Sequence, residues 1–211
     1  QGNATSGLGI NRRRLKQCIY NLLIGEITIS KVITKTRVDN LELVPATIQL
    51  AGAEVELAAA IGREQIMKSA LEDVKDFYEY IFIDCPPSLG LLTVNALTAS
   101  NSVLIPLQCE YYALEGLSQL MDTITIVRKR INRSLSIEGI VFTMFDGRTN
   151  LSIQVVDEVK KHFRKEVYRT IIPRNVRLSE APSHGLPVVV YAPRSKGAEV
   201  YMDLALEVVQ R

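Results

Sequence analysis

The sequence contains few of the residues that mark several classes of protein. Among its 211 residues there are three cysteines, two histidines and no tryptophan. The cysteines Cys18, Cys85 and Cys109 are odd in number and form no Cys-x-x-Cys pair, which argues against a disulfide scaffold or a structural zinc site. Apolar runs are far shorter than the roughly 20 residues that a membrane-spanning helix needs. This composition favours a reducing cytosol.

A second absence concerns the glycines. The chain has 12 glycines, and none precedes a lysine, so the phosphate-binding pattern Gly-x-x-x-x-Gly-Lys-Ser/Thr does not occur. Gly7 and Gly9 form Gly-x-Gly, but Arg12 stands where the dinucleotide-binding fingerprint needs a third glycine. The first residue is Gln1 and not methionine, so we expect the biological chain to begin earlier.

Charge is balanced overall but unevenly distributed. The net charge is +2, yet residues 128–177 contain 12 Lys or Arg against 5 Asp or Glu, so this part carries +7 and the rest carries −5. A basic half on a nearly neutral protein favours a surface that faces a polyanion. The alternative is a set of solvated helix faces without a binding role.

Short apolar runs alternate with segments of helical periodicity. The strand candidates are 80–84, 102–107, 137–144 and 167–172, with shorter apolar segments at 41–44 and 188–191. Helical spacing covers 54–78 (with a break near Gly62), 117–131, 152–163 and 197–210. The alternation predicts an α/β fold, with a mostly parallel sheet covered by helices on both faces, in a single domain over residues 1–211.

The residues that follow the strands are the site candidates, because such sheets bind ligands at the carboxyl ends of their strands. Asp84 follows a run of large apolar residues, which is the Walker B pattern of an acid that orients Mg²⁺; an ordinary turn acid is the alternative. Arg148 and Arg177 follow two other strands and would suit phosphate contacts, unless they pair with nearby acids such as Glu180. Without a recognition-helix motif, any nucleic-acid binding should be non-specific.

The histidines and cysteines offer no second site. His162 and His184 have no metal-ligand spacing, so we expect neither to be catalytic. Cys85 and Cys109 end two strand candidates, and we expect both to be small core residues.

Several long segments resemble one known family. The segments are 1–9, 45–57, 80–100, 105–120, 146–159 and 172–205. They resemble the ParA/Soj chromosome-partitioning ATPases of bacteria, and the likeness spans essentially the whole chain. The resemblance implies a three-layer P-loop NTPase-like fold with a mostly parallel sheet. The chain looks like a member that begins inside an Asp-Pro-Gln-Gly-Asn segment, and so lacks the N-terminal strand, the deviant Walker A phosphate loop and its helix.

The resemblance also implies an activity and partners. An intact member would bind ATP and Mg²⁺, form a nucleotide-dependent homodimer and bind double-stranded DNA without sequence preference. A partner of the ParB/Spo0J type would stimulate hydrolysis, and the cycle would move origin regions. The protein would be cytoplasmic and associated with the nucleoid, with no membrane partner.

Site residues follow from the matching segments. Asp84 matches the Walker B acid, which would orient Mg²⁺ through water, and Arg148 and Arg177 match residues implicated in DNA binding. The residues that match nucleotide-binding segments are Gly2, Asn3, Pro86, Thr143, Met144, Pro173, Arg174 and Asn175.

Other interpretations remain for comparison. A MinD-like membrane ATPase would end in a basic amphipathic helix, whereas Glu199, Asp203 and Glu207 make the last predicted helix acidic. A nitrogenase-iron-protein-like reductase would need paired cluster cysteines. The serious alternative is a non-catalytic fragment or degenerate paralogue that acts only by binding DNA or protein. Without a phosphate loop, we expect these 211 residues alone to be catalytically inactive and to leave strand edges unpaired beside an open cleft.

Overall fold

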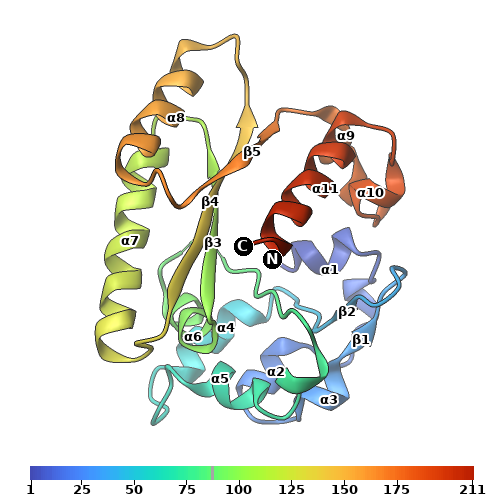
Figure 1. The fold of residues 1–211 in the computed structure, drawn as a ribbon. Helices are drawn as coiled ribbons and strands as arrows, with labels where there is room; N and C mark the ends of the chain where they lie inside the picture. Colours follow the sequence, from blue (N-terminus) through green and yellow to red (C-terminus); the bar gives the residue numbers. More distant parts are fainter. Residues whose placement is uncertain (87) are drawn as a thin grey trace.

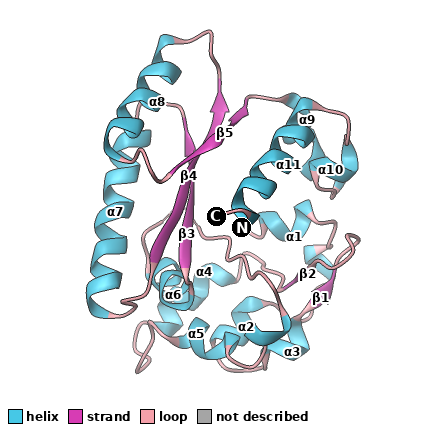
Figure 2. Ribbon diagram, viewed as in Figure 1, coloured by secondary structure: helices cyan, strands magenta, loops and turns pink. Residues whose placement is uncertain are grey.

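The computed structural model describes residues 1–86 and 88–211, and its main sheet has three parallel strands in the order β3-β4-β5 (Figures 1 and 2). These strands are β3 (Ser102–Gln108), β4 (Ser136–Phe145) and β5 (Val167–Pro173). The three strands predicted at 102–107, 137–144 and 167–172 are therefore confirmed. β4 is the central strand, and it pairs with β3 from Ser136 to Thr143 and with β5 from Ile140 to Phe145.

Helices cover the two faces of this sheet, as predicted (Figure 1). The helices α7 (Ala113–Arg130) and α8 (Asn150–His162) lie on one face, and α11 (Lys196–Val209) lies on the other. Side-chain caps fix two helix starts: Thr149 Oγ1 accepts from Ser152 N at 3.4 Å, and Ser195 Oγ accepts from Ala198 N at 3.2 Å. In the described parts of the chain, no helix combines the length and apolarity needed to cross a bilayer.

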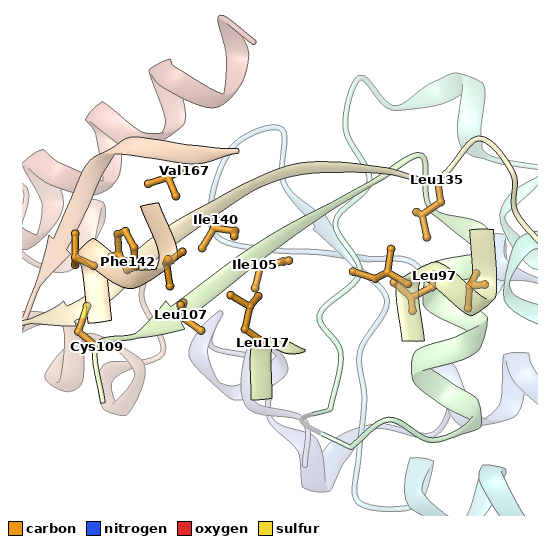
Figure 3. Packing of buried hydrophobic residues seen from close by; sticks show 13 residues of the cluster. Leu97, Ile105, Leu107, Cys109, Leu117, Leu135, Ile140, Phe142 and Val167 are labelled. Atoms are coloured by element: carbon orange, nitrogen blue, oxygen red, sulfur yellow. The ribbon is translucent and has the colours of Figure 1, made fainter. Parts of the chain in front are cut away.

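The hydrophobic core lies between β3–β5 and the helices α7 and α8 (Figure 3). Ile140 and Phe142 on β4 are fully buried on this side. Val141, between them, points to the opposite face and packs with residues of β5 and α11. The alternation follows from the two-residue period of a strand, and β4 is apolar at every one of these positions because both of its faces are covered.

The helix α11 is fastened to the edge strand β5 by a carboxylate. Glu207 accepts hydrogen bonds from Arg169 N at 2.8 Å and from Thr170 N at 3.0 Å. Arg169 and Thr170 lie between Val167 and Ile171, where the pairing of β5 with β4 shifts its register. Glu207 therefore supplies an acceptor to this irregular stretch and holds α11 to β5. The segments α9 (Val176–Glu180), η3 (Ala181–His184) and α10 (Val188–Tyr191) connect β5 to α11.

Shorter elements make up the N-terminal part. They are α1 (Asn3–Gly7), η1 (Arg12–Arg14), α2 (Ile19–Leu23), α3 (Ile29–Val32), β1 (Thr34–Lys35), β2 (Glu42–Leu43), α4 (Leu50–Leu57), α5 (Ile66–Leu71), η2 (Lys75–Phe77) and α6 (Leu91–Ala99). The strand predicted at 41–44 is present as β2, but it pairs antiparallel with β1 in a separate small sheet. The helix predicted over 54–78 is divided, because α4 ends at Leu57 and α5 begins at Ile66, with Gly62 at a φ of 69° between them.

The strand predicted at 80–84 is absent, and this prediction was wrong. Residues 78–86 have no strand or helix, Tyr80 is 50% exposed and Phe82 is 77% exposed. A strand needs a neighbour for its backbone hydrogen bonds, and no strand in residues 1–86 or 88–211 pairs with this segment or with the outer edge of β3. A cavity of about 720 Å³ lies between the end of β3 and the first turns of α7, and the expected cleft beside an unpaired strand stays a prediction.

Candidate functional site

The carboxyl ends of β4 and β5 lie side by side and bring two predicted segments together. Phe145 is in register with Pro173, and Arg174 N donates to Phe145 O at 3.1 Å. Thr143 and Met144 precede this junction on β4. The two predicted segments therefore lie side by side where the parallel strands end, and their role in ligand binding stays a prediction.

Met144 has an unusual backbone conformation. Its φ is 53°, in the left-handed region that residues other than glycine seldom adopt, although it lies within β4. Such strain is most often found at functional sites, where the surrounding structure holds it in place. The conformation interrupts the alternation of the strand directly before its end and leaves Met144 36% exposed. Sequence patterns give no sign of it, because methionine is ordinary in a strand.

Polar groups link the strand ends across the sheet. Asn175 caps α9, with its Oδ1 accepting from Arg177 N at 2.9 Å. Arg174 Nη2 lies 3.6 Å from Glu110 Oε1, which joins the segment after β5 to the segment after β3. Glu110 was not among the predicted site residues, although its place after a predicted strand was a usable signal.

Asp84 and Pro86 are on the exposed segment that precedes α6. Asp84 is exposed, and no donor in residues 1–86 or 88–211 forms a hydrogen bond to its carboxylate. The described residues contain no cluster of three or more His, Cys, Asp or Glu side chains that could hold a metal. Cys85 is exposed and is not the core residue that we expected, whereas Cys109 is buried. Pro87, in the same segment, lies outside the described residues.

A carboxylate from α4 holds the start of α6, directly after this segment. Glu54 Oε1 accepts from Leu92 N at 3.2 Å, and a Cβ at position 90 would overlap the same carboxylate, so the contact needs Gly90. The fully buried Asn95 anchors α6 further, donating to Arg63 O at 2.7 Å. Neither Glu54 nor Asn95 was found from the sequence, because each contact joins segments far apart in the chain.

Gly2 and Asn3 lie at the start of α1, packed against other segments. Gly2 has a φ of 67°, and a Cβ there would overlap the carbonyl oxygen of Ala46. Thr5 Oγ1 accepts from Ala46 N at 2.8 Å and fixes the same approach. This end of the chain also contacts η3, so the N-terminal segment lies between residues near 46 and the segment that follows α9.

The two arginines predicted to bind DNA are exposed and each is paired with an acid. Arg148 Nη2 lies 2.7 Å from Asp146 Oδ2, and Arg177 Nη1 lies 2.8 Å from Glu180 Oε2. Hydrogen bonds from the Arg148 side chain and backbone hold the pKa of Asp146 far below its usual range. The alternative that these arginines pair with nearby acids is therefore confirmed as geometry, and their DNA role stays a prediction.

The histidines make ordinary local contacts. His162 Nε2 lies 3.3 Å from Glu158 Oε1 on the exposed face of α8. His184 stacks on Tyr191, with ring centroids 4.6 Å apart.

Comparisons with known proteins bear on this geometry. Residues 1–137 match the model of the AAA domain. The chain is 64% identical over 208 residues to the sporulation initiation inhibitor protein Soj of Bacillus subtilis, covering 99% of this chain and 82% of that protein. It is 53% identical over 211 residues to the chromosome partitioning protein ParA of Myxococcus xanthus, covering 100% of this chain and 75% of that protein.

A solved structure agrees with the fold. Cobyrinic acid a,c-diamide synthase from Mycobacterium smegmatis, with bound ADP and magnesium, superposes with a TM-score of 0.81 at 35% identity. The match covers 95% of this chain and 74% of that one. The chain shares more than half of its residues with both relatives along its whole length, and its parallel sheet fits a P-loop NTPase-like fold. The chain belongs to the Soj/ParA family of chromosome-partitioning ATPases.

Proposed function

We propose that this chain has the role of a Soj-type partitioning ATPase. In this proposal it dimerises with ATP, binds DNA without sequence preference and releases it after a ParB-type partner stimulates hydrolysis, which drives origin segregation. The protein works in the cytoplasm, on the nucleoid. The observation that carries the proposal is the 64% identity with the Bacillus subtilis Soj protein over 99% of the chain.

The residues of this chain fit part of a nucleotide site. In this proposal the adenine base binds at the ends of β4 and β5, beside the strained backbone of Met144. The other residues proposed to surround the base are Thr143, Pro173, Arg174 and Asn175. Asp84 has an exposed carboxylate with no bonded donor in residues 1–86 and 88–211, so it is free to orient a water on Mg²⁺. Gly2, Asn3 and Pro86 would line the phosphate side. When bound, Mg²⁺ would neutralise charge on the phosphate oxygens.

The phosphate side of that site is incomplete in this sequence. No Gly-Lys pair occurs in the 211 residues, so neither backbone N–H donors of a phosphate loop nor its lysine are present. Phosphoryl transfer depends on such donors, because they stabilise charge at the γ-phosphate. We therefore propose that these residues alone do not turn over ATP.

The DNA surface in this proposal is formed by Arg148 and Arg177. Both are exposed, with side chains 89% and 56% accessible. Arg148 follows β4, and Arg177 lies in α9, the first helix after β5. Guanidinium groups there would contact phosphates in any sequence, because phosphate oxygens are the same at every base pair.

A second candidate is a non-catalytic protein that binds DNA or partner proteins only. The missing Gly-Lys pair favours it over the enzyme for the chain as it stands. Both candidate functions use the same DNA-binding surface, and they differ in whether the protein hydrolyses ATP.

Steady-state phosphate release with ATP and Mg²⁺ tests this part of the proposal, with Asp84→Ala as the control. We expect the parent and the variant to release phosphate at the same background rate. Release by the parent that disappears in Asp84→Ala would show that the chain is a working ATPase and would contradict the predicted inactivity.

A further inference from the structure

The two proposed DNA-binding arginines are held by their acids in different ways. Arg148 donates from Nε to Asp146 Oδ1 at 2.9 Å and from Nη2 to Asp146 Oδ2 at 2.7 Å. Arg177 donates from one nitrogen, Nη1, to Glu180 Oε2 at 2.8 Å. The Arg148 guanidinium therefore forms two hydrogen bonds to the Asp146 carboxylate, and the Arg177 guanidinium forms one to Glu180.

The acids are fixed more firmly than the arginines. The Asp146 side chain is 23% exposed, against 89% for Arg148, and Asp146 Oδ1 also accepts from the backbone N of Arg148 at 3.1 Å. Glu180 is 37% exposed, against 56% for Arg177, and Tyr191 Oη donates to it at 3.4 Å. If either pair opens, the arginine is therefore the side chain that moves, and the carboxylate stays at the surface.

We propose that Asp146 and Glu180 are electrostatic latches that weaken the binding of DNA phosphate to this surface, Asp146 more strongly than Glu180. The inference rests on the proposed DNA-binding function and deepens it. A phosphate competes with the carboxylate for the same N–H donors, since both anions favour the paired donors of a guanidinium. The displaced carboxylate then remains beside the phosphate and repels it.

The order of the two effects follows from the geometry. DNA must replace two hydrogen bonds at Arg148, and the carboxylate that it meets is held in place by a backbone N–H. At Arg177 it must replace one, and the other guanidinium nitrogens have no acidic partner in the described residues. The opposite possibility, that each acid orients its arginine for DNA, predicts weaker binding when the acid is removed.

Asp146→Asn and Glu180→Gln test the proposal, because both remove charge and keep an oxygen acceptor. The asparagine can still accept from Arg148 N, so the turn after β4 is retained. The matched control is Glu72→Gln, which removes the same charge from an exposed ion pair with Lys75, at 2.5 Å, in the N-terminal part. Melting temperatures of the three variants show whether each remains folded.

Dissociation constants are measured by fluorescence anisotropy, with a labelled DNA duplex of random sequence, ATP and Mg²⁺, over a series of salt concentrations. We expect Asp146→Asn to bind roughly twofold to fivefold more tightly than the parent, in line with the modest worth of exposed ion pairs. Glu180→Gln should gain less and Glu72→Gln nothing. The slope of log affinity against log salt should steepen by up to about 1 for Asp146→Asn.

Several results would overturn the inference. Parent-like or weaker binding by Asp146→Asn, with the parent bound to DNA, rejects the latches and leaves the DNA function intact. An equal gain in Glu72→Gln would show that net charge alone is responsible. No binding by any of the proteins would reject the DNA function and the latches together.

A second measurement tests the Arg148–Asp146 pair without measuring the affinity for DNA. Hydrogen exchange at the Arg148 Nε–H, followed by NMR, should be slow in the parent and fast in Asp146→Asn. Fast exchange in the parent would show that the pair does not persist in solution.

Discussion

The strand β4 and the segment 80–84 both contain a run of large apolar residues, but they have different surroundings. β4 has β3 on one side and β5 on the other, and its Ile140 and Phe142 are fully buried. The segment 80–84 has no neighbouring strand in the described chain, and Phe82 is 77% exposed. The comparison shows that an apolar run becomes a strand only where neighbours can accept and donate its backbone hydrogen bonds.

The largest expected effect is on the free energy of unfolding, and it compares Phe142 on β4 with Phe82 in the segment 80–84. Phe142→Ala removes a ring that is completely buried between β4 and the helices, and should lower the free energy of unfolding by about 3–5 kcal/mol. Phe82→Ala removes an exposed ring and should change it by less than about 0.5 kcal/mol. Urea unfolding followed by circular dichroism measures both. Equal losses would mean that Phe82 packs in a core, and would break the comparison.

A smaller effect concerns the thiols that follow two apolar runs. Cys85 follows the segment 80–84 and is exposed, whereas Cys109 follows β3 and is 3% exposed. Burial raises the pKa of Cys109 to about 11. Partial desolvation of the thiol, and then the nearby Asp84 carboxylate, raise the pKa of Cys85 as well. The contrast therefore depends on the exposure of the two residues and not on the direction of their pKa shifts.

Alkylation of the folded protein with iodoacetamide, with peptide mass analysis, checks this contrast. We expect Cys85 to be modified first, and Cys109 to react only after unfolding. Similar rates at the two thiols would show that the strand β3 opens as readily as the segment 80–84.

The smallest effect concerns the contact that positions the start of α6. Glu54→Ala removes the acceptor for Leu92 N and should weaken local protection by about 1 kcal/mol, the usual worth of one such bond. The control is Glu56→Ala on the same helix, since Glu56 accepts instead from Tyr20 Oη at 2.6 Å. Amide exchange at Leu92 measures the difference. Unchanged exchange in Glu54→Ala would mean that Gly90 and Asn95 hold α6 without it.

Local periodicity predicted the main sheet and its helices because these elements find their partners nearby in the chain. The strands at 102–107, 137–144 and 167–172 are joined by single helices, so the parallel arrangement followed from the order of elements. The segment 80–84 has the same pattern but no partner in the described chain, which periodicity cannot reveal.

The residues of the candidate site also fall into those that the sequence indicated and those that it did not. Arg148 and Arg177 were singled out because they follow strand ends, where ligands of parallel sheets bind, whereas Thr143 and Arg174 came from the resemblance to ParA/Soj segments. Glu54 and Asn95 were not found, because their contacts connect residues that are 38 and 32 positions apart and leave no local pattern. The strained φ of Met144 also has no counterpart in the sequence; it lies where the register of β4 with β5 shifts, between Phe142 and Phe145.

The most direct test of the account is the retardation of a random-sequence DNA duplex by the parent, Arg148→Glu and Arg177→Glu, with ATP and Mg²⁺, at several salt concentrations. We predict that the parent retards DNA, and that each variant binds more weakly to every sequence, with a salt dependence shallower by about 1 per lost phosphate contact. Retardation by either variant as strong as that of the parent at all salt concentrations would contradict the assignment of that arginine to the DNA surface.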